Sequence, residues 1–561
     1  MNKSKQYKNL ESKKNIEVYE SKHLPLVKEF AERIGLVETI NKLVPSEMDI
    51  DPGTMLLGLI LDTLSGRTPL YRLEEFFENQ DTELLLGKSV PEEAFADHNV
   101  ARVLDKVYEA GTMKVFSEIS RNALDFFNID TSHVSFDTTS VNVYGDYEDY
   151  SKDEKDASIK IAHGYSKDHR PDLKQFLISM LCVDRNIPIF GKTEDGNASD
   201  KNINNAVLSH ISKHMREHGL EKNAFIYIAD SAMVTEKNLK EIGEEIQFIT
   251  RLPATYKECE RVIAEAVSEK KWEEIGVLSI TKATKNRPTT SYKGYEGEVE
   301  LYGKKYRATV VHSSAHDKRR QKKIERELKS NLELLESEKK KTSKKEFFCE
   351  KDATAEMKEI ESIDNKYYKI NSSIKEVPKY KKGRPKGGVK EVKEMHYRVE
   401  VKIEEKEKAI EKMKEEAGCF VLVNNVPKEG EDGYITSEIL KAYKDQHGIE
   451  QNFKFLKDPA IVNGIFLKKG ERIEVLGLIL LLALLIWRLI ERELRIFVKE
   501  TGEELPGWNK GQTNRPTSFM MLTKFSRLIV INIGGKRSLN RPLSEEQKKY
   551  LRALCPFGKP A

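Results

Sequence analysis

Cysteine is scarce in this chain, and its cysteines are isolated from one another. Only five occur in 561 residues, and no C-x-x-C pair is present. This excludes a disulfide-stabilised scaffold and a zinc ribbon, and it is typical of a protein from a reducing compartment. An excess of one charge is also lacking, because the formal net charge is only +4. The total charge therefore does not indicate a nucleic-acid partner. Only the distribution of the charges along the chain can indicate one.

Neither a signal peptide nor a membrane span is expected. The polar start of the chain lacks the apolar segment of a signal peptide. The one apolar run that resembles a span, Val475 to Trp487, has 13 residues without a charge, whereas a span needs about 18–20. We expect this run to form a buried core helix, and we expect a cytoplasmic protein with no membrane partner.

Charged and apolar residues are both abundant. Apolar residues make up 39% of the chain and charged residues 33%, and the second value exceeds the roughly 25% of ordinary globular proteins. The length predicts several domains. The predicted segments are a polar arm (1–22), a helical N-terminal domain (23–130), a first core part (131–253), an insertion with β-hairpins and a charged helix (254–417), a second core part (418–500) and a basic tail (501–561).

The first core part has the pattern of a mixed sheet. Five segments alternate or are short and apolar, which is typical of strands. They are His133–Gly145, Leu173–Val183, Ile187–Thr193, Phe225–Asp230 and Gln247–Pro253. Helices are predicted after the third strand, at Asn202–His218, and after the fourth, at Thr235–Ile242. This order predicts an α/β fold with a mixed five-stranded sheet that begins with an antiparallel meander.

Three acids stand out by their places in these elements. Asp137 lies on the first predicted strand, and Asp230 ends the fourth. Ligands of α/β sheets gather at strand ends, so a carboxylate there is a candidate for a site. Glu450 lies within a predicted helix, Glu438–Lys457. Each acid taken alone would be expected to cap a turn or to face solvent.

Glu450 belongs to a polar stripe on its helix. At about 100° per residue, Tyr443, Gln446, Glu450 and Lys457 fall within roughly 60° of one another. The stripe combines a phenol, an amide, a carboxylate and an ammonium group, which suits a metal-bound phosphodiester. Glu450 would ligate the metal, and Lys457 and Tyr443 would hold phosphate oxygens.

These residues resemble the motifs of a known family. The motifs are DTTS around Asp137, ADSA around Asp230 and Tyr443-x2-Gln446-x3-Glu450-x6-Lys457. Together they resemble the DDE transposases of bacterial insertion sequences, in the insertion-sequence-four (YREK) branch. His163–Phe176 and Gly196–Asp200 resemble its longer-chain subgroup. The resemblance covers most of the chain and implies an RNase H-like core, interrupted by a β-rich insertion domain and preceded by the helical domain.

The resemblance also implies a mechanism and partners. Asp137, Asp230 and Glu450 would be catalytic and would bind two Mg²⁺ ions, for which Mn²⁺ can substitute, because converging carboxylates need cations between them. Water would cut one strand at the element end, and the freed 3′-OH would attack another phosphodiester. The expected partners are double-stranded DNA, as terminal inverted repeats and as target, and a second copy of the chain in a nucleoid-associated complex.

One position departs from the family pattern. Gln446 stands where the family has Arg, and an amide has neither the charge nor the bidentate fork of a guanidinium. Phosphate binding there would be weaker, or a nearby base such as Lys444 or Lys454 would substitute. A decayed copy of the element is the third possibility.

A basic segment, Pro378–Lys390, contains the motif GRPKGG. Gly-Arg-Pro resembles the core of an AT-hook, which lies in a narrow A·T minor groove. Lys382, Arg384 and Lys386 are the predicted phosphate contacts, since cations without a nearby acid attract DNA. The alternative is a basic loop in solvent.

Two further features allow more than one interpretation. His210, His214 and His218 recur every fourth residue on a predicted helix and could hold zinc, although a solvated histidine stripe is expected. Trp272 opens the predicted insertion and could stack on a displaced base, although core packing is expected.

Four functions compete on this evidence. The first is a metal-dependent transposase, and the second is a nuclease of the same fold that performs no strand transfer. The third is a catalytically inactive or domesticated DNA-binding relative, which the glutamine at 446 favours. The fourth is a charged helical scaffold. The segment Asp317–Glu346 favours it, since it has 12 basic and 7 acidic residues.

Overall fold

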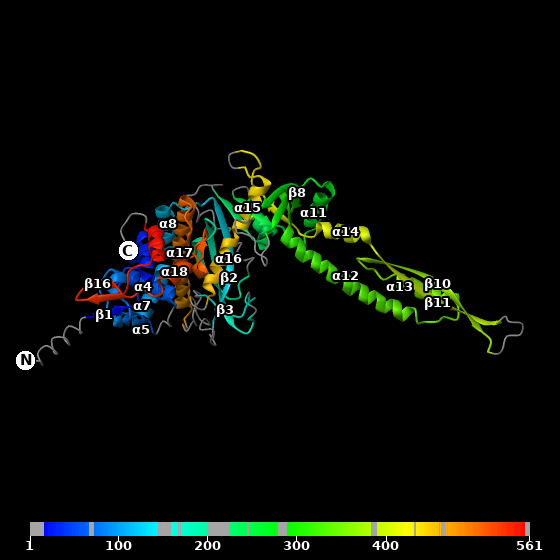
Figure 1. Cartoon of the computed structure of the whole chain (residues 1–561), viewed down its shortest axis with the longest axis horizontal. Coiled ribbons are helices and arrows are strands. Elements are labelled where there is room, and N and C mark those ends of the chain that lie inside the picture. Colours follow the sequence, from blue (N-terminus) through cyan, green and yellow to red (C-terminus); the bar gives the residue numbers. More distant parts are fainter. Residues whose placement is uncertain are drawn as a thin grey trace, which may run out of the picture. The chain divides into compact units, whose positions relative to one another are not determined.

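The chain is a mixed α/β protein with two compact units (Figure 1). The computed structural model describes residues 16–66, 72–143, 159–166, 168, 170–199, 203, 225–243, 246–278, 289–382, 390–430, 433–458, 461, 467 and 469–555. The first unit is Met1–Thr250 with Ala442–Ala561, and the second unit is Arg251–Lys441. The second unit therefore interrupts the first in sequence. It also includes strand β12 (Cys419–Asn424), which was predicted to lie in the core.

Residues 23–130 of the first unit form a series of helices, as predicted. They are α2 (Leu24–Arg33), α3 (Leu36–Leu43), α4 (Pro52–Ser65), α5 (Leu73–Glu78), α6 (Thr82–Leu86), α7 (Asp97–Ala110) and α8 (Thr112–Phe127). Helix α4 is buried along almost its whole length. Its ends are well defined, because the Asp51 carboxylate accepts a hydrogen bond from the Thr54 N–H at 2.8 Å and Gly66 takes the left-handed conformation after the last turn.

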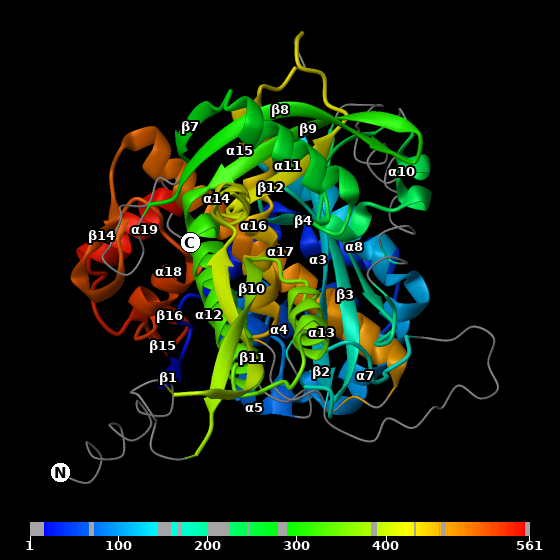
Figure 2. The same ribbon diagram turned by 90° about the vertical axis from the view of Figure 1, so that its right-hand side faces the viewer.

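All five predicted core strands are present, and Figure 2 shows β2 and β3 side by side. They are β2 (His133–Val143), β3 (Lys174–Val183), β4 (Ile187–Glu194), β5 (Ile226–Ala229) and β6 (Gln247–Arg251). The order is β4-β3-β2-β5-β6, antiparallel from β4 to β2 and parallel from β2 to β6. This is the predicted meander followed by parallel strands. Helix α10 (Glu236–Ile242) is also confirmed, whereas the helix predicted at Asn202–His218 lies outside the described residues apart from position 203.

The predicted core helix is confirmed as α17 (Gly470–Thr501). By length and composition it could cross a membrane, but 94% of its most apolar 18-residue window is buried, as in the core helix of a soluble protein. Helices α2, α4, α7 and α8 pack on it, and so does strand β4. The helix lies very close to the strand: a Cβ added to Gly477 would be 2.3 Å from Thr193, and one added to Gly191 would be 2.4 Å from Leu481.

The two ends of the first unit correct the prediction. Residues 501–561 were predicted as a basic tail without regular structure, but they form β13 (Leu505–Pro506), β14 (Gln512–Thr513), α18 (Ser518–Phe525), β15 (Val530–Ile533), β16 (Lys536–Leu539) and α19 (Glu545–Leu554). Within the predicted N-terminal arm, Ile16–Tyr19 form strand β1, which pairs antiparallel with β15. The strands at these ends have four residues or fewer and, unlike the apolar β5, are mostly polar or exposed, so their pattern did not indicate strands.

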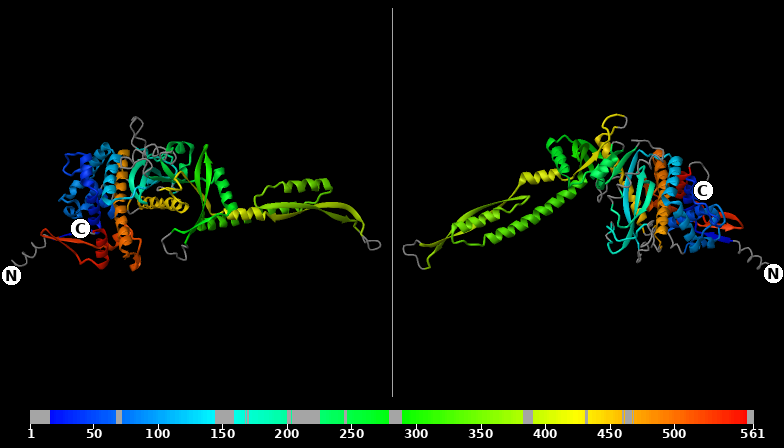
Figure 3. Two further views of the ribbon diagram at one scale, coloured as in Figure 1. Left: turned by 90° about the horizontal axis from the view of Figure 1, so that it is seen from above. Right: turned by 180° about the vertical axis from the view of Figure 1, so that it is seen from behind.

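The second unit contains an antiparallel sheet of order β12-β9-β8-β7 with helix α11 (Lys257–Glu269) packed on it. The other strands are β7 (Glu273–Val277), β8 (Ser291–Leu301) and β9 (Lys304–Ser313), so the hairpin predicted at Gly294–Ser314 is confirmed. The predicted charged helix is α12 (Ser314–Thr342). It shares an apolar cluster with α13 (Glu350–Glu361), α14 (Glu407–Glu416) and the ribbon of β10 (Tyr368–Tyr380) and β11 (Val392–Glu405), seen from two sides in Figure 3.

The fold makes one prediction about pH. His23 precedes α2, and its buried ring donates from Nε2 to the Leu64 carbonyl at 3.0 Å and lies edge-on to Trp487. Burial lowers the pKa of His23 from 6.5 to about 4. Between pH 6.5 and 4, His23 is therefore protonated in the unfolded chain but neutral in the folded chain. We expect the free energy of unfolding to fall by roughly 3 kcal/mol from this group as the pH drops through that window.

Urea denaturation at several pH values would measure this effect. His23→Phe keeps an aromatic ring beside Trp487 but cannot bind a proton, so its free energy of unfolding should depend less on pH than that of the native chain between pH 6.5 and 4. Identical pH dependence in the two proteins would show that His23 does not act in this way.

Candidate active site

A cavity of about 620 Å³ in the first unit brings together two of the three predicted acids. Its walls come from β2 and from helix α16 (His447–Leu456) with the residue that follows it. The lining residues are Asp137, Thr138, Thr139, Glu450, Phe453, Lys454 and Lys457. Asp137 and Glu450 are 313 positions apart in sequence, so the fold, and not local proximity, puts both carboxylates at one cavity.

Asp137 lies within β2, opposite Met180 of β3. Its side chain is half-buried, and its Oδ1 accepts a hydrogen bond from the Thr138 N–H at 2.7 Å. Thr138 and Thr139 are buried. The carboxylate is thus carried by a strand with neighbours on both sides, which is a rigid support for a site.

Asp230 lies beside Asp137 along the sheet. Ser135 of β2 pairs with Ile228 of the parallel strand β5, and each aspartate follows its partner by two positions. Neighbouring strands are about 4.8 Å apart, so the two backbones are close at this level. Both carboxylates also raise the pKa of the buried Tyr227, after the larger effect of burial.

Asp230 does not belong to the described residues that line the cavity. It caps a short 3-10 helix, Ser231–Met233, because its Oδ1 accepts a hydrogen bond from the Ala232 N–H at 3.0 Å. The buried Thr250 fixes its backbone by donating to the Asp230 carbonyl at 2.7 Å. Asp137 therefore shares a cavity with Glu450, and it lies next to Asp230 on the neighbouring strand of the sheet.

The helix predicted at Glu438–Lys457 consists of α15 (Thr436–Asp445) and α16, which meet at Gln446. The backbone of Gln446 is itself helical, with φ −57° and ψ −20°, and its carbonyl accepts from the Ile449 N–H at 3.0 Å. Gly448, near the start of α16, allows the helix to lie against the β3–β4 turn. A Cβ at this position would be only 2.3 Å from the Arg185 carbonyl oxygen.

Two of the four residues of the predicted stripe line the cavity. They are Glu450 and Lys457, whereas Tyr443 and Gln446 are not among its lining residues. The Gln446 amide oxygen is buried and has no hydrogen-bond partner among the described residues. Lys454, one of the two bases considered as a substitute for the family Arg, does line the cavity, since it follows Glu450 by four residues and shares its helix face.

Lys457 has a partner that the sequence did not reveal. Its Nζ lies 2.6 Å from Oδ1 of Asp168, and the Asn142 side chain donates to the other oxygen of Asp168 at 3.4 Å. Asp168 belongs to His163–Phe176, a segment noticed only for its resemblance to the family. The ion pair holds the ammonium group at the cavity, and no periodicity connects positions 168 and 457.

The opposite side of α16 is fastened by a buried polar network. Asn452 donates to the Asn186 carbonyl at 2.9 Å, and its Oδ1 accepts from Arg488 Nε of α17 at 2.8 Å. Arg488 also donates to the Gln451 carbonyl at 2.9 Å and lies 3.2 Å from Glu491. The network fixes the rotation of α16, so that Glu450 and Lys454 face the cavity.

The cavity offers donors for a cation and for a phosphate. Carboxylate oxygens suit Mg²⁺ or Mn²⁺, and ammonium groups suit phosphate oxygens. No group of three or more His, Cys, Asp or Glu side chains that could hold a metal is found within the part of the chain that the structure describes. The donor chemistry fits a hard divalent cation at Asp137 and Glu450, and a third carboxylate would have to come from Asp230.

The other predicted sites lie in part outside the described residues. Lys382 is exposed just after β10, whereas Arg384 and Lys386 are not described. The three histidines at 210, 214 and 218 are not described either.

Trp272 of the second unit lines a separate cavity of about 340 Å³. The indole is half-buried and lies edge-on to Tyr295 and His312, with centroid distances of 6.3 and 6.2 Å. Lys270 and Lys293 line the same cavity. Glu415 lines it as well, and Lys293 pairs with Glu274 at 2.8 Å. Trp272 is therefore not fully packed in a core, and its cavity has lining residues of both charges.

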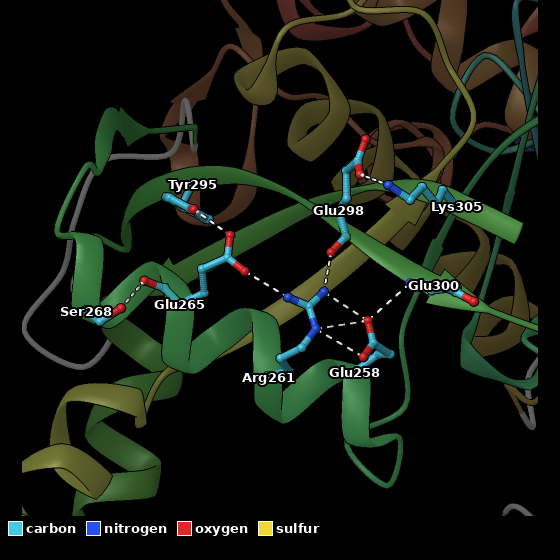
Figure 4. Close-up of polar contacts among 8 residues, drawn as sticks. All are labelled: Glu258, Arg261, Glu265, Ser268, Tyr295, Glu298, Glu300 and Lys305. Atoms are coloured by element: carbon cyan, nitrogen blue, oxygen red, sulfur yellow. Dashed lines mark hydrogen bonds and ion pairs between the residues drawn. The ribbon is translucent and has the colours of Figure 1, made fainter. Parts of the chain in front are cut away.

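The aromatic neighbour of Trp272 is anchored by the polar cluster in Figure 4. The Tyr295 hydroxyl donates to Glu265 at 2.8 Å, and burial and this carboxylate together raise the pKa of Tyr295. Arg261 bridges Glu265 and Glu258 of α11, at 2.8 and 2.9 Å, and donates to the Glu298 carbonyl of β8. The cluster fastens α11 to β8 and so fixes one wall around Trp272.

Comparison with known protein families gives a match for the N-terminal part of the chain. Residues 15–121 match the family described as "Domain of unknown function (DUF4277)". This span covers β1 and the helices of the first unit up to α8, and none of the residues that line the cavity. No curated protein matches the chain.

The network around Asn452 makes a testable prediction. Asn452→Ala removes the acceptor of a buried guanidinium and the donor to the Asn186 carbonyl. We expect the free energy of unfolding to fall by roughly 2–4 kcal/mol, since buried polar groups are left unpaired. Urea denaturation would measure the loss, and hydrogen exchange would show whether the α16 amides lose protection first.

Lys454→Ala provides the control for this experiment, because it truncates an exposed side chain of the same helix. Its effect on stability should stay within about 0.5 kcal/mol. Equal losses in the two variants would mean that α16 does not depend on the buried network.

Proposed function

We propose that the chain is a DDE transposase of the insertion-sequence-four branch, which binds the ends of its element and catalyses DNA strand cleavage and strand transfer. The observation that carries the proposal is the shared cavity of Asp137 and Glu450, with Lys454 and Lys457 beside them. Two acids and two cations from distant parts of the chain are what a metal-assisted phosphodiester site requires.

The strand positions support an RNase H-like core as part of this proposal. Asp137 lies on the first core strand, Asp230 directly follows the fourth, and Glu450 lies on a helix after the second unit. These are the places that such a core assigns to its three acids, and the second unit takes the place of the insertion domain.

Each residue has a role in the proposed chemistry. Asp137, Asp230 and Glu450 would hold two Mg²⁺ or Mn²⁺ ions, which when bound activate an attacking oxygen and stabilise a leaving one. Lys454 and Lys457 would hold phosphate oxygens, and Asp168 keeps the ammonium of Lys457 in place.

The proposed reaction has two steps. In the first, a water oxygen bonds to phosphorus at the element end and the bond to the 3′ oxygen breaks, which leaves a 3′-OH and a 5′-phosphate. In the second, that 3′ oxygen bonds to a target phosphorus and displaces the target 3′ oxygen, which gains the proton. Neither step needs an oxidant or reductant.

The second unit would contribute contacts to DNA. Trp272 would stack on a displaced base, since it is half-buried and Lys270 and Lys293 line its cavity. Lys382, with Arg384 and Lys386, would contact phosphates. The proposed working form is a homodimer on element ends in the cytoplasm, associated with the nucleoid.

A catalytically inactive DNA-binding relative is the alternative that one observation favours. Gln446 lacks the charge of the family Arg, and its buried amide oxygen has no partner among the described residues. Lys454 at the cavity weighs against this alternative, because it supplies a positive charge near Glu450. A nuclease without strand transfer differs only in its products.

Isosteric replacement of the acids tests the proposal. DNA from both flanks of the gene, expected to contain short inverted repeats, would be labelled and incubated with the protein and Mg²⁺. Asp137→Asn, Asp230→Asn and Glu450→Gln should each lower end cleavage by roughly 10³-fold or more, because metal ligands are lost. Binding of the same DNA in EDTA should not weaken.

Asp172→Asn is the matched control, since Asp172 is an exposed acid that pairs with Arg170 outside the cavity. Cleavage by Asp137→Asn at the rate of this control would refute the assignment. Cleavage without joining of the labelled 3′ end to a plasmid would identify a nuclease, and no cleavage by the native chain would favour the inactive relative.

A second experiment decides which lysine replaces the family Arg. Lys454→Gln and Lys457→Gln should each reduce cleavage of subsaturating DNA by roughly 10- to 100-fold, the value of a charge-assisted contact. Lys444→Gln, which changes the other candidate base on α15, should have little effect because Lys444 does not line the cavity. A larger loss from Lys444→Gln would reverse the assignment.

A further inference from the structure

Helix α12 of the second unit has one face fixed against the protein and one face turned to solvent. Its 29 residues give a length of about 43 Å. Leu335 is buried in the apolar cluster, and Ile324 and Leu328 pack partly buried against it. Gln321 adds a hydrogen bond to the Lys414 carbonyl of α14 at 3.0 Å. The rotation of the helix is therefore set, and its outward face can be identified.

Between positions 318 and 329, the outward face carries only cations. Counted from Ile324 at about 100° per residue, a sector of roughly 100° opposite the apolar side contains five residues between positions 318 and 329. They are Lys318, Arg319, Lys322, Arg326 and Lys329, and all five are exposed. Glu325 lies just outside the sector. This basic stripe is about 17 Å long.

The cations of the basic stripe differ from others on the same helix. Lys323, Lys339 and Lys341 lie in ion pairs with Glu327, Glu336 and Glu338, at 3.6, 3.2 and 2.7 Å. None of the five stripe residues forms an ion pair with a residue that the structure describes. Five cations on one helix face repel one another. Glu325, at helical spacing from Lys322 and Lys329, offsets part of that repulsion, and a polyanion relieves the rest.

We propose that the basic stripe of α12 is a sequence-independent binding surface for the phosphate backbone of duplex DNA. The backbone of a duplex is a dense line of negative charge, which exposed cations along about 17 Å of a helix can contact. No apolar or aromatic side chain lies in the sector between 318 and 329, so the surface is suited neither to stacking on bases nor to a lipid layer or an apolar protein partner. The choice of DNA as the polyanion rests on the proposed function.

The dependence of binding on salt tests the stripe. The full chain would be titrated in EDTA with a labelled 40-base-pair duplex of arbitrary sequence, at several KCl concentrations. Each phosphate contact contributes about 0.9 to the slope of log K against log salt. Lys318→Gln, Lys322→Gln and Lys329→Gln combined should make the slope shallower by about 2.7 and weaken binding by roughly 10-fold or more at low salt.

The matched control removes the same number of charges from the same helix. Lys323→Gln, Lys339→Gln and Lys341→Gln combined takes away three ion-paired cations and should leave the slope nearly unchanged. Glutamine is a good helix former, so both variants should keep the helical circular dichroism of the native chain. Equal slopes for the two triple variants, or no change in either, would overturn the proposal.

Further arms identify the partner and separate the two proposals. Tighter binding to duplex RNA or to anionic vesicles than to DNA, lost in the stripe variant, would overturn DNA as the ligand. Because binding is measured without metal, a shallow slope in the stripe variant supports the surface even if Asp137→Asn cleaves normally. Conversely, the native chain could cleave DNA with Mg²⁺ while the stripe variant keeps the native salt slope. That result would refute DNA binding by the basic stripe and leave the proposed function standing.

Discussion

The candidate active site depends on a charge buried in the core. Arg488 lies in the middle of the apolar helix α17, where an unpaired guanidinium would be very costly. Glu491 neutralises it from the next turn, and its remaining donors reach Asn452 and the Gln451 carbonyl of α16. Arg488 is thus hydrogen-bonded by the helix that carries Glu450, and the position of Glu450 follows from the packing of α17.

The β3–β4 turn secures the same helix from another side. Asp184 and Arg185 both take positive φ, at 41° and 74°, a conformation that L residues adopt only where contacts hold it. Arg492 of α17 pairs with Asp184 at 2.7 Å, and Arg185 pairs with Asp445 at 3.1 Å. The Asn186 carbonyl then accepts from Asn452. Two helices and one turn therefore fix each other, although no single contact among them has an obvious sequence signature.

The sequence predicted the sheet well, because that part of the structure is encoded locally. The strands alternate or are short and apolar, and the turns between them are polar, so their order followed from the pattern alone. Asp137 and Glu450 could be proposed as partners from their motifs, and the fold places both at one cavity. The ends of the first unit could not be predicted, because β1 gains its structure from β15, more than 500 residues away.

The site was predicted only in part, because some of its contacts join distant segments. Gly448 of α16 lies against the Arg185 carbonyl of the β3–β4 turn, and the sequence gives no sign of that contact. The same is true of Asp168 and Lys457, whose ion pair joins a loop to the end of a helix.

The place of the glutamine at 446 can be compared with the cations of the cavity. Gln446 is not among the residues that line the cavity, whereas Lys454 and Lys457 both line it. Asp168 holds Lys457 in place. Lys457 stands at the Lys position of the family motif, so under the proposed function Lys454 is the cation that would take the place of the family Arg. An ammonium group supplies the charge of a guanidinium but not its planar, bidentate geometry.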